Sequence, residues 1–95
     1  MNTTTASIDT TSPYETRTIG STSPHMSGSY STHVNVIDTR LGQHTQEVAW
    51  TRRVTRRNDA TSTEMGEFGD AVDAAIREAN REATRLNAAH RASRA

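Results

Sequence analysis

Apolar side chains recur at three- and four-residue steps through the last third of the chain, with polar side chains between them. This spacing is typical of one face of an α-helix. Residues 61–95 are therefore predicted to form one amphipathic helix, about 45 Å long at 1.5 Å per residue. The apolar stripe consists of Met65, Phe68, Val72, Ala75, Ile76, Ala79, Ala83 and Leu86.

The side chains of this stripe shrink along the helix, from large residues in its first half to mostly alanine in its second. Large side chains suit a helix lying on a sheet, whereas an alanine face allows close helix–helix approach. We therefore expect the first half to pack within the subunit and the second half between subunits. Gly66 and Gly69 either weaken the first turns by about 1 kcal/mol each or mark the approach of another backbone, and both readings stay open.

Local signals also define how the predicted helix begins and which charges it carries. Thr61, followed three residues later by Glu64, is a capping box. Acidic residues occupy the first half and arginines the second, as the helix dipole favours. This gradient would favour an antiparallel neighbouring helix over a parallel one.

Apolar and polar residues alternate over residues 29–57, which predicts a long β-hairpin. Residues 40–43 form the expected turn, with Gly42 free to adopt a positive φ. Folding there puts Val36 opposite Val48, Val34 opposite Trp50, and Tyr30 opposite Val54. Both strands then carry their apolar residues on the same face, with Ile37 as the exception.

Residues 1–28 are rich in Ser, Thr and Gly and are predicted to be a flexible or partner-ordered arm. Residues 14–19 have strand-like composition, so an edge strand in this subunit or in a neighbour is the alternative to a disordered tail. The predicted fold class is α+β: this arm, then a domain over residues 29–95. The domain holds a β-hairpin, extended to a three-stranded antiparallel meander if the arm adds a strand, and one long C-terminal helix.

Large apolar residues are few for a chain of 95 residues, and cysteine is absent. Small chains bury a low fraction of their surface, so we expect oligomerisation or a protein partner to cover the helix. The formal net charge is zero, which excludes a global field that recruits nucleic acid or anionic membrane. Neither a signal peptide nor a membrane-spanning run is evident, so the expected location is cytoplasmic, or the virion if the chain is phage-encoded.

An arginine cluster is the densest group of charge and the candidate nucleic-acid contact. It comprises Arg52, Arg53, Arg56 and Arg57, with Trp50 just upstream. On a strand, Arg53 and Arg57 project to the face opposite Arg52 and Arg56, so the ribbon could grip a phosphate backbone while Trp50 stacks on a base. Solvated edge charges that block sheet pairing are the competing interpretation, and Trp50 faces either a core or a ligand.

No pattern in the sequence predicts catalysis. The four histidines lack metal-ligand spacing, and no nucleophile motif or phosphate-binding glycine loop is present. We therefore expect no catalytic residue, cofactor, metal or small-molecule substrate, and a protein that is not an enzyme.

Three functional hypotheses follow from these patterns. The leading one is a non-enzymatic assembly protein, acting as a homo-oligomer or as a small subunit of a larger complex. Its composition resembles that of phage virion or accessory proteins, and also that of many small bacterial proteins. The alternatives are a small dimeric nucleic-acid-binding regulator using the arginine-rich ribbon, and an inhibitor or antitoxin-like module that folds on a protein target.

Overall fold

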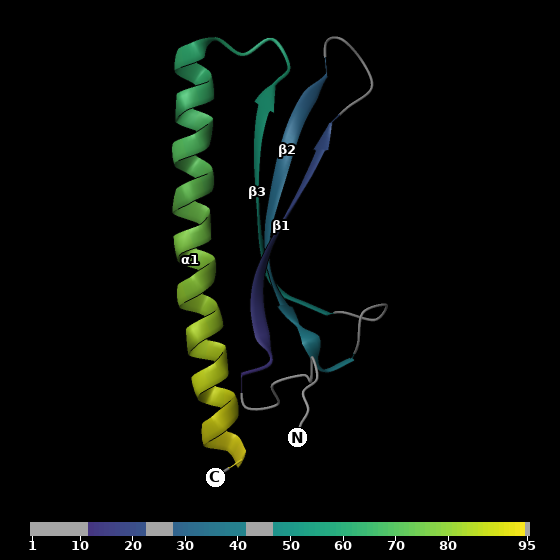
Figure 1. The fold of residues 1–95 in the computed structure, drawn as a ribbon, viewed down its shortest axis with the longest axis vertical. Coiled ribbons are helices and arrows are strands. Elements are labelled where there is room, and N and C mark those ends of the chain that lie inside the picture. The colour runs from purple at the N-terminus through teal and green to yellow at the C-terminus, as the bar shows by residue number, and fades with distance from the viewer. Residues whose placement is uncertain (1–11, 23–27, 42–46, 95) are drawn as a thin grey trace, which may run out of the picture.

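The computed structural model describes residues 12–22, 28–41 and 47–94. It contains a three-stranded antiparallel sheet in the order β1-β2-β3, followed by one long helix (Figure 1). The elements are β1 (Tyr14–Thr22), β2 (Ser29–Asp38), a 3-10 turn η1 (Thr39–Leu41), β3 (Glu47–Arg57) and α1 (Ser62–Arg94). The α+β fold with a meander and a C-terminal helix is thereby confirmed.

The strand β1 comes from the segment that composition assigned to a flexible arm. It pairs with β2 along its whole length, from Tyr14 opposite Asp38 to Thr22 opposite Tyr30. The strand-like residues therefore form an edge strand in this same chain, and the sheet begins at Tyr14 rather than at Ser29. The rest of the predicted arm, residues 1–11 and 23–27, lies outside the described residues.

The register between β2 and β3 differs from the predicted one by two residues. Val36 lies opposite Trp50, Val34 opposite Arg52, and Thr32 opposite Val54. The connection is longer on the β3 side than a turn at residues 40–43 requires, and residues 42–46 are outside the described part of the chain. Because the side-chain period of a strand is two, a slip of two residues leaves Trp50, Arg52 and Val54 on their predicted face. Val48 lies opposite Ile37, a shift of one residue, and therefore leaves the face it was predicted to share with Trp50.

A β-bulge interrupts the β2–β3 ladder between Val36 and Ile37, where Trp50 and Val48 are the successive partners. Ala49 is the extra residue on β3. Ile37, the expected exception to the apolar face, is 4% exposed, whereas Val48 is 51% exposed. The bulge therefore bends β3 where the ladder would otherwise continue.

The helix α1 covers one face of the sheet (Figure 1). The core consists of Val34, Val36, Ala75, Ala79 and Ala83, flanked by the partly buried Tyr14, Trp50, Val54, Ile76 and Leu86. The expected division of the helix into an intramolecular and an intermolecular half does not hold for Ala75, Ala79 and Ala83, because these alanines pack on the central strand of the same chain. Small alanine side chains let the helix lie close to the branched valines of β2.

The predicted capping box is confirmed at the start of α1. The Thr61 N–H donates to Glu64 Oε1 at 2.9 Å, and the Glu64 N–H donates to Thr61 Oγ1 at 3.2 Å. The hydrogen bond from the Thr61 backbone holds the pKa of Glu64 below its usual value. From this cap the helix runs for 33 residues and sets the 50 Å length of the molecule.

Candidate interaction surfaces

The helix stripe proposed as an interface is mostly covered within a single chain. Ala75, Ala79 and Ala83 are buried, and Phe68, Val72, Ile76 and Leu86 are half-buried. The Phe68 ring meets the Tyr30 ring edge-on, with 5.8 Å between centroids. Met65, at 46% exposure, is the one member that the sheet leaves in solvent. A second copy would therefore find little of this stripe free.

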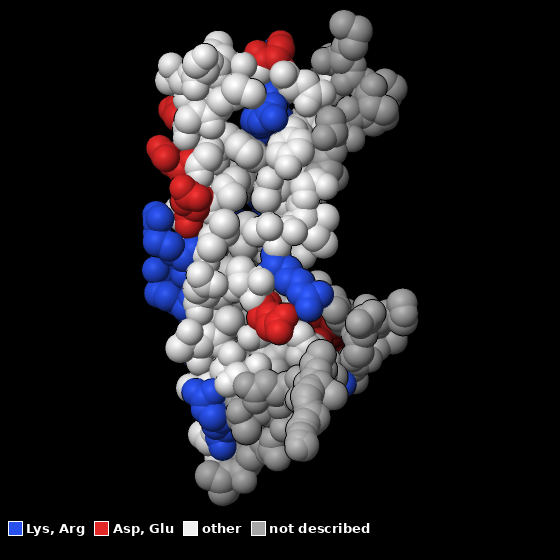
Figure 2. Space-filling view, viewed as in Figure 1, with Lys and Arg blue, Asp and Glu red and all other residues white. Residues whose placement is uncertain are grey.

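Charge on the helix surface follows the predicted gradient. Figure 2 shows acidic side chains over the N-terminal part of α1 and basic side chains over its C-terminal part. Some of this charge is neutralised locally, since Arg85 pairs with Glu82 one turn away. This pairing lowers the pKa of the Glu82 carboxyl and raises that of the Arg85 guanidinium.

The helix-facing arginines of the cluster are engaged within the chain. Arg52 forms an ion pair with Glu78 at 2.5 Å, and its guanidinium lies 5.4 Å from the centroid of the Trp50 ring system. Arg56 lies over the Tyr30 ring at 4.8 Å. These contacts hold both guanidinium groups in the seam between β3 and α1.

The other two arginines project to the opposite face of β3, as the two-residue period predicts. Arg57 makes a two-point contact with Asp59, at 2.9 and 2.8 Å, which raises the pKa of Arg57 and lowers that of Asp59. Arg53 forms no ion pair with any residue that the structure describes. The structure thus places the four arginines on one strand without assembling them into one surface.

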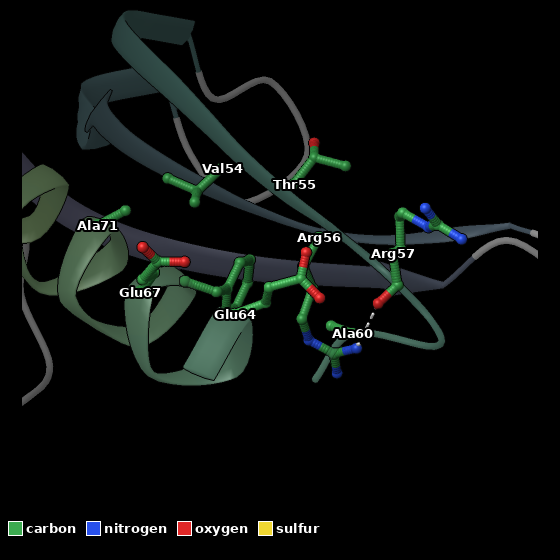
Figure 3. Close-up of a pocket in the computed structure, with 9 residues that line it drawn as sticks. Val54, Thr55, Arg56, Arg57, Ala60, Glu64, Glu67 and Ala71 are labelled. Atoms are coloured by element: carbon green, nitrogen blue, oxygen red, sulfur yellow. Dashed lines mark hydrogen bonds between the residues drawn. The ribbon is translucent and has the colours of Figure 1, made fainter. Parts of the chain in front are cut away.

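Two shallow grooves lie along the seam between β3 and α1. The first, of about 380 Å³, is lined by Val54 and Phe68 together with acidic side chains of α1 and basic side chains of β3 (Figure 3). The second, of about 340 Å³, is lined by Trp50 and by alternating arginine and glutamate. Trp50 is half-buried and also packs against the core, so its indole belongs to the fold as well as to the groove wall.

The face of the sheet away from α1 is polar. Ser31 and Thr55 share a hydrogen bond of 2.9 Å across β2 and β3, and the Thr51 hydroxyl donates to Asn35 Oδ1 at 2.6 Å. On β1, Glu15 and Arg17 pair with each other at 3.1 Å. Ile19, at 59% exposure, is the large apolar residue on this face that stands most open.

The outer edge of β1 is closed at one end by a side chain from the helix. The Tyr14 N–H donates to Asn87 Oδ1 at 2.9 Å, and Asn87 Nδ2 donates to the Tyr14 carbonyl at 3.1 Å. Both backbone groups of Tyr14 therefore point away from β2. Direction alternates along an antiparallel strand, so the backbone groups of Thr16, Thr18, Gly20 and Thr22 also point outward. No residue in the described part of the chain pairs with them.

The two edges of the sheet differ in character. β3 carries the bulge and four arginines, which are devices that discourage the pairing of an edge with another strand. β1 pairs with β2 in unbroken register and carries one charge of each sign. It also runs away from α1 toward its C-terminal end, so the helix does not lie over that half of the edge (Figure 1). The β1 edge is the surface best suited to strand addition.

A polar cluster that sequence reasoning missed joins the end of β2 to the C-terminal half of α1. Arg40 binds both carboxylate oxygens of the buried Asp38, contacts Tyr14 Oη at 3.2 Å, and lies 3.3 Å from His90 Nδ1. The Arg40 hydrogen bonds hold the pKa of Asp38 below its usual value against the opposing effect of burial. Two features of the sequence could have indicated these contacts. Asn87 follows Leu86 at the edge of the apolar stripe, and Asp38 and Arg40 are two residues apart at the end of a predicted strand.

Within residues 12–22, 28–41 and 47–94, no three His, Cys, Asp or Glu side chains gather as metal ligands would. In that same part of the chain, no helix is long and apolar enough to cross a membrane. No protein-family model, curated protein or solved structure matches this chain.

Proposed function

We propose that this protein is a non-enzymatic self-assembly protein, which joins subunits by adding a strand to the β1 edge. The observation that carries the proposal is the row of outward-facing backbone groups from Thr16 to Thr22, which nothing in the described chain occupies. Unpaired edges of this kind are templates for pairing with another chain.

The apolar content of the chain supports the same function. The core cluster beneath α1 consists of two valines and three alanines, and the larger residues packed against it are only partly buried. Ile37 is buried outside this cluster. Chains of this size with so small a core commonly gain stability from oligomerisation. An added strand would extend the sheet and shield Ile19, which is otherwise open to solvent.

The alternative of a nucleic-acid-binding regulator has less support. Arg52, Arg56 and Arg57 already contact glutamate, aromatic rings or aspartate, which leaves Arg53 as the arginine of the cluster without such a partner among the described residues. Phosphate binding would have to displace these contacts. It would also show a steep dependence on salt concentration, because each phosphate contact releases a counterion.

The test is the absolute mass of the purified chain by light scattering behind a sizing column, at low and high salt. Wild type should be a multimer that persists in salt and is free of nucleic acid. Thr18→Pro removes an outward N–H of β1 and should yield a folded monomer. The matched control Arg53→Pro removes an outward N–H of β3 and should leave the mass unchanged. A wild-type chain that stays a folded monomer at high concentration would overturn the proposed function.

A further inference from the structure

We infer that the occupant of the β1 edge is a second copy of this chain, paired antiparallel with a two-fold axis at Ile19. This inference rests on the proposed function and adds the partner, the register and the residue on the axis. Three observations support it: the limits of the free edge, the exposure of Ile19, and the distribution of charge along β1.

The free edge has a defined length. Asn87 occupies both backbone groups of Tyr14, so within β1 the outward groups left for strand pairing are those of Thr16, Thr18, Gly20 and Thr22. A symmetric antiparallel pair that uses all four places residue 16 opposite residue 22 of the second copy, and residue 18 opposite residue 20. The centre of this register is Ile19, which then faces itself across the axis.

The side chains of β1 fit this register. Ile19, 59% exposed in one chain, would pack against its symmetry mate on the polar face and so be removed from water. Arg17 would lie opposite Ser21 of the second copy. Its guanidinium forms an ion pair with Glu15 of the same chain at 3.1 Å. No like charges face each other along the pair.

Symmetric antiparallel pairing of two chains through their β3 edges would be unfavourable. A symmetric pair that uses the full length of β3 has its centre at Arg52, so two arginines would lie directly opposite each other. The bulge between Val36 and Ile37 would also interrupt the new ladder near Trp50. The difference between the two edges thus selects β1.

The resulting dimer would have a six-stranded sheet with both helices on one face. The two β2 strands would be three strand spacings apart, about 14 Å at 4.7–4.9 Å each. Each α1 covers its own three strands, so two helices fit side by side without displacing either from its core.

Introducing a positive or a negative charge at residue 19, on the two-fold axis, tests the register. Ile19→Lys and Ile19→Glu should each reduce the multimer to monomer, since two like charges would meet at the centre. An equimolar mixture of the two should restore a dimer that contains one chain of each, detected by native mass spectrometry. A mixture no different from its components would overturn the inference.

Cysteine crosslinking provides a second measurement that does not require the interface to be broken. The chain has no native cysteine. In this register residue 19 is a non-hydrogen-bonded pair, with Cα atoms about 4.5 Å apart, within disulfide range. Ile19→Cys should therefore form a covalent dimer on mild oxidation, at least tenfold faster than the control Arg17→Cys. The Arg17→Cys positions would be about 14 Å apart, because residue 17 lies opposite residue 21 of the second copy, four residues along the strand from its symmetry mate.

The outcomes separate the two proposals. A monomeric wild type would overturn the proposed function and this inference together. A multimeric wild type whose Arg52→Cys variant crosslinks, or whose Arg17→Cys and Ile19→Cys variants crosslink equally well, would leave self-assembly standing and overturn the two-fold pairing at Ile19.

Discussion

The carboxamide of Asn87 pairs with both backbone polar groups of Tyr14, accepting from the N–H at 2.9 Å and donating to the C=O at 3.1 Å. This is the pattern of hydrogen bonds that a residue of a neighbouring strand would make. A single helical side chain therefore ends the exposed edge of β1 and ties the C-terminal half of α1 to the sheet.

Asn87→Ala should lower the free energy of unfolding by about 1–3 kcal/mol, because two part-buried backbone groups lose their partners. Urea denaturation followed by circular dichroism measures the change. Asn80→Ala, at an exposed position of the same helix, is the matched control and should change stability by less than about 0.5 kcal/mol. Equal effects of the two substitutions would contradict the role given to Asn87.

Gly20→Ala should destabilise the fold by about 1–3 kcal/mol, since the added methyl group would overlap the Tyr30 hydroxyl. The Tyr30 ring cannot move aside freely, because Phe68 and Arg56 pack against it. Removing the hydroxyl in Gly20→Ala/Tyr30→Phe should recover part of the loss. A double-mutant cycle without coupling would show that the two residues do not meet.

Gly69→Ala, unlike Gly20→Ala, should raise the free energy of unfolding, by about 1 kcal/mol, as expected for alanine replacing glycine on an exposed helix. Apart from the flanking residues and the helix's own backbone, no atom in the described residues lies within 4 Å of the position a Cβ would take. Thermal unfolding gives the stability, and light scattering gives the mass. A loss of assembly in this variant would mean that another backbone does approach the helix there.

Acid should destabilise the protein partly through Asp38. The Arg40 hydrogen bonds lower the pKa of Asp38 in the folded state below its ordinary value of 3.8. This carboxylate therefore contributes stability above about pH 4, and the contribution is lost as the pH falls through the folded pKa. Asp38→Asn should flatten the dependence of stability on pH between about 4 and 2, whereas Asp70→Asn on the exposed helix surface should retain it. Unfolding curves of both variants and of the wild type at several pH values measure this dependence. Equal pH dependence in the two variants would contradict the role given to Asp38.

Trp50→Ala should reduce the free energy of unfolding by about 2–3 kcal/mol, less than the 3–5 kcal/mol typical of a fully buried tryptophan. The reason is that the indole is half-buried, with one side against the core and the other beneath Arg52. Thr51→Ala, on the opposite face of β3, is the control. A variant of unchanged stability would mean that Trp50 serves a ligand rather than the fold.

The sequence was sufficient to predict the secondary-structure elements because their signals are local. The helix period, the Thr61–Glu64 cap and the alternation along residues 29–57 each lie within one element. For residues 14–19 the sequence allows both a strand and a disordered tail, since their β-branched composition competes with the Ser- and Thr-rich residues around them. The structure shows a strand, β1, which pairs with β2 along its whole length.

The features that were missed depend on contacts between distant segments. The bulge at Ala49 and the length of the connection before β3 shifted the register by two residues. The bond between Tyr14 and Asn87 spans the whole domain and leaves no periodic signature. The arginine cluster is evident in the sequence, but only the fold reveals that Glu78 and Asp59 neutralise two of its members.

The contrast between a bulged, arginine-bearing β3 edge and a plain β1 edge also limits the size of an assembly. A sheet with two open edges could add chains without end and form a fibre. One protected edge leaves a single place for addition, and a symmetric partner uses that place in both chains at once. Substituting the arginines of β3 with threonine would remove one of its two protective devices, the other being the bulge, and should shift the proposed closed pair toward an open polymer.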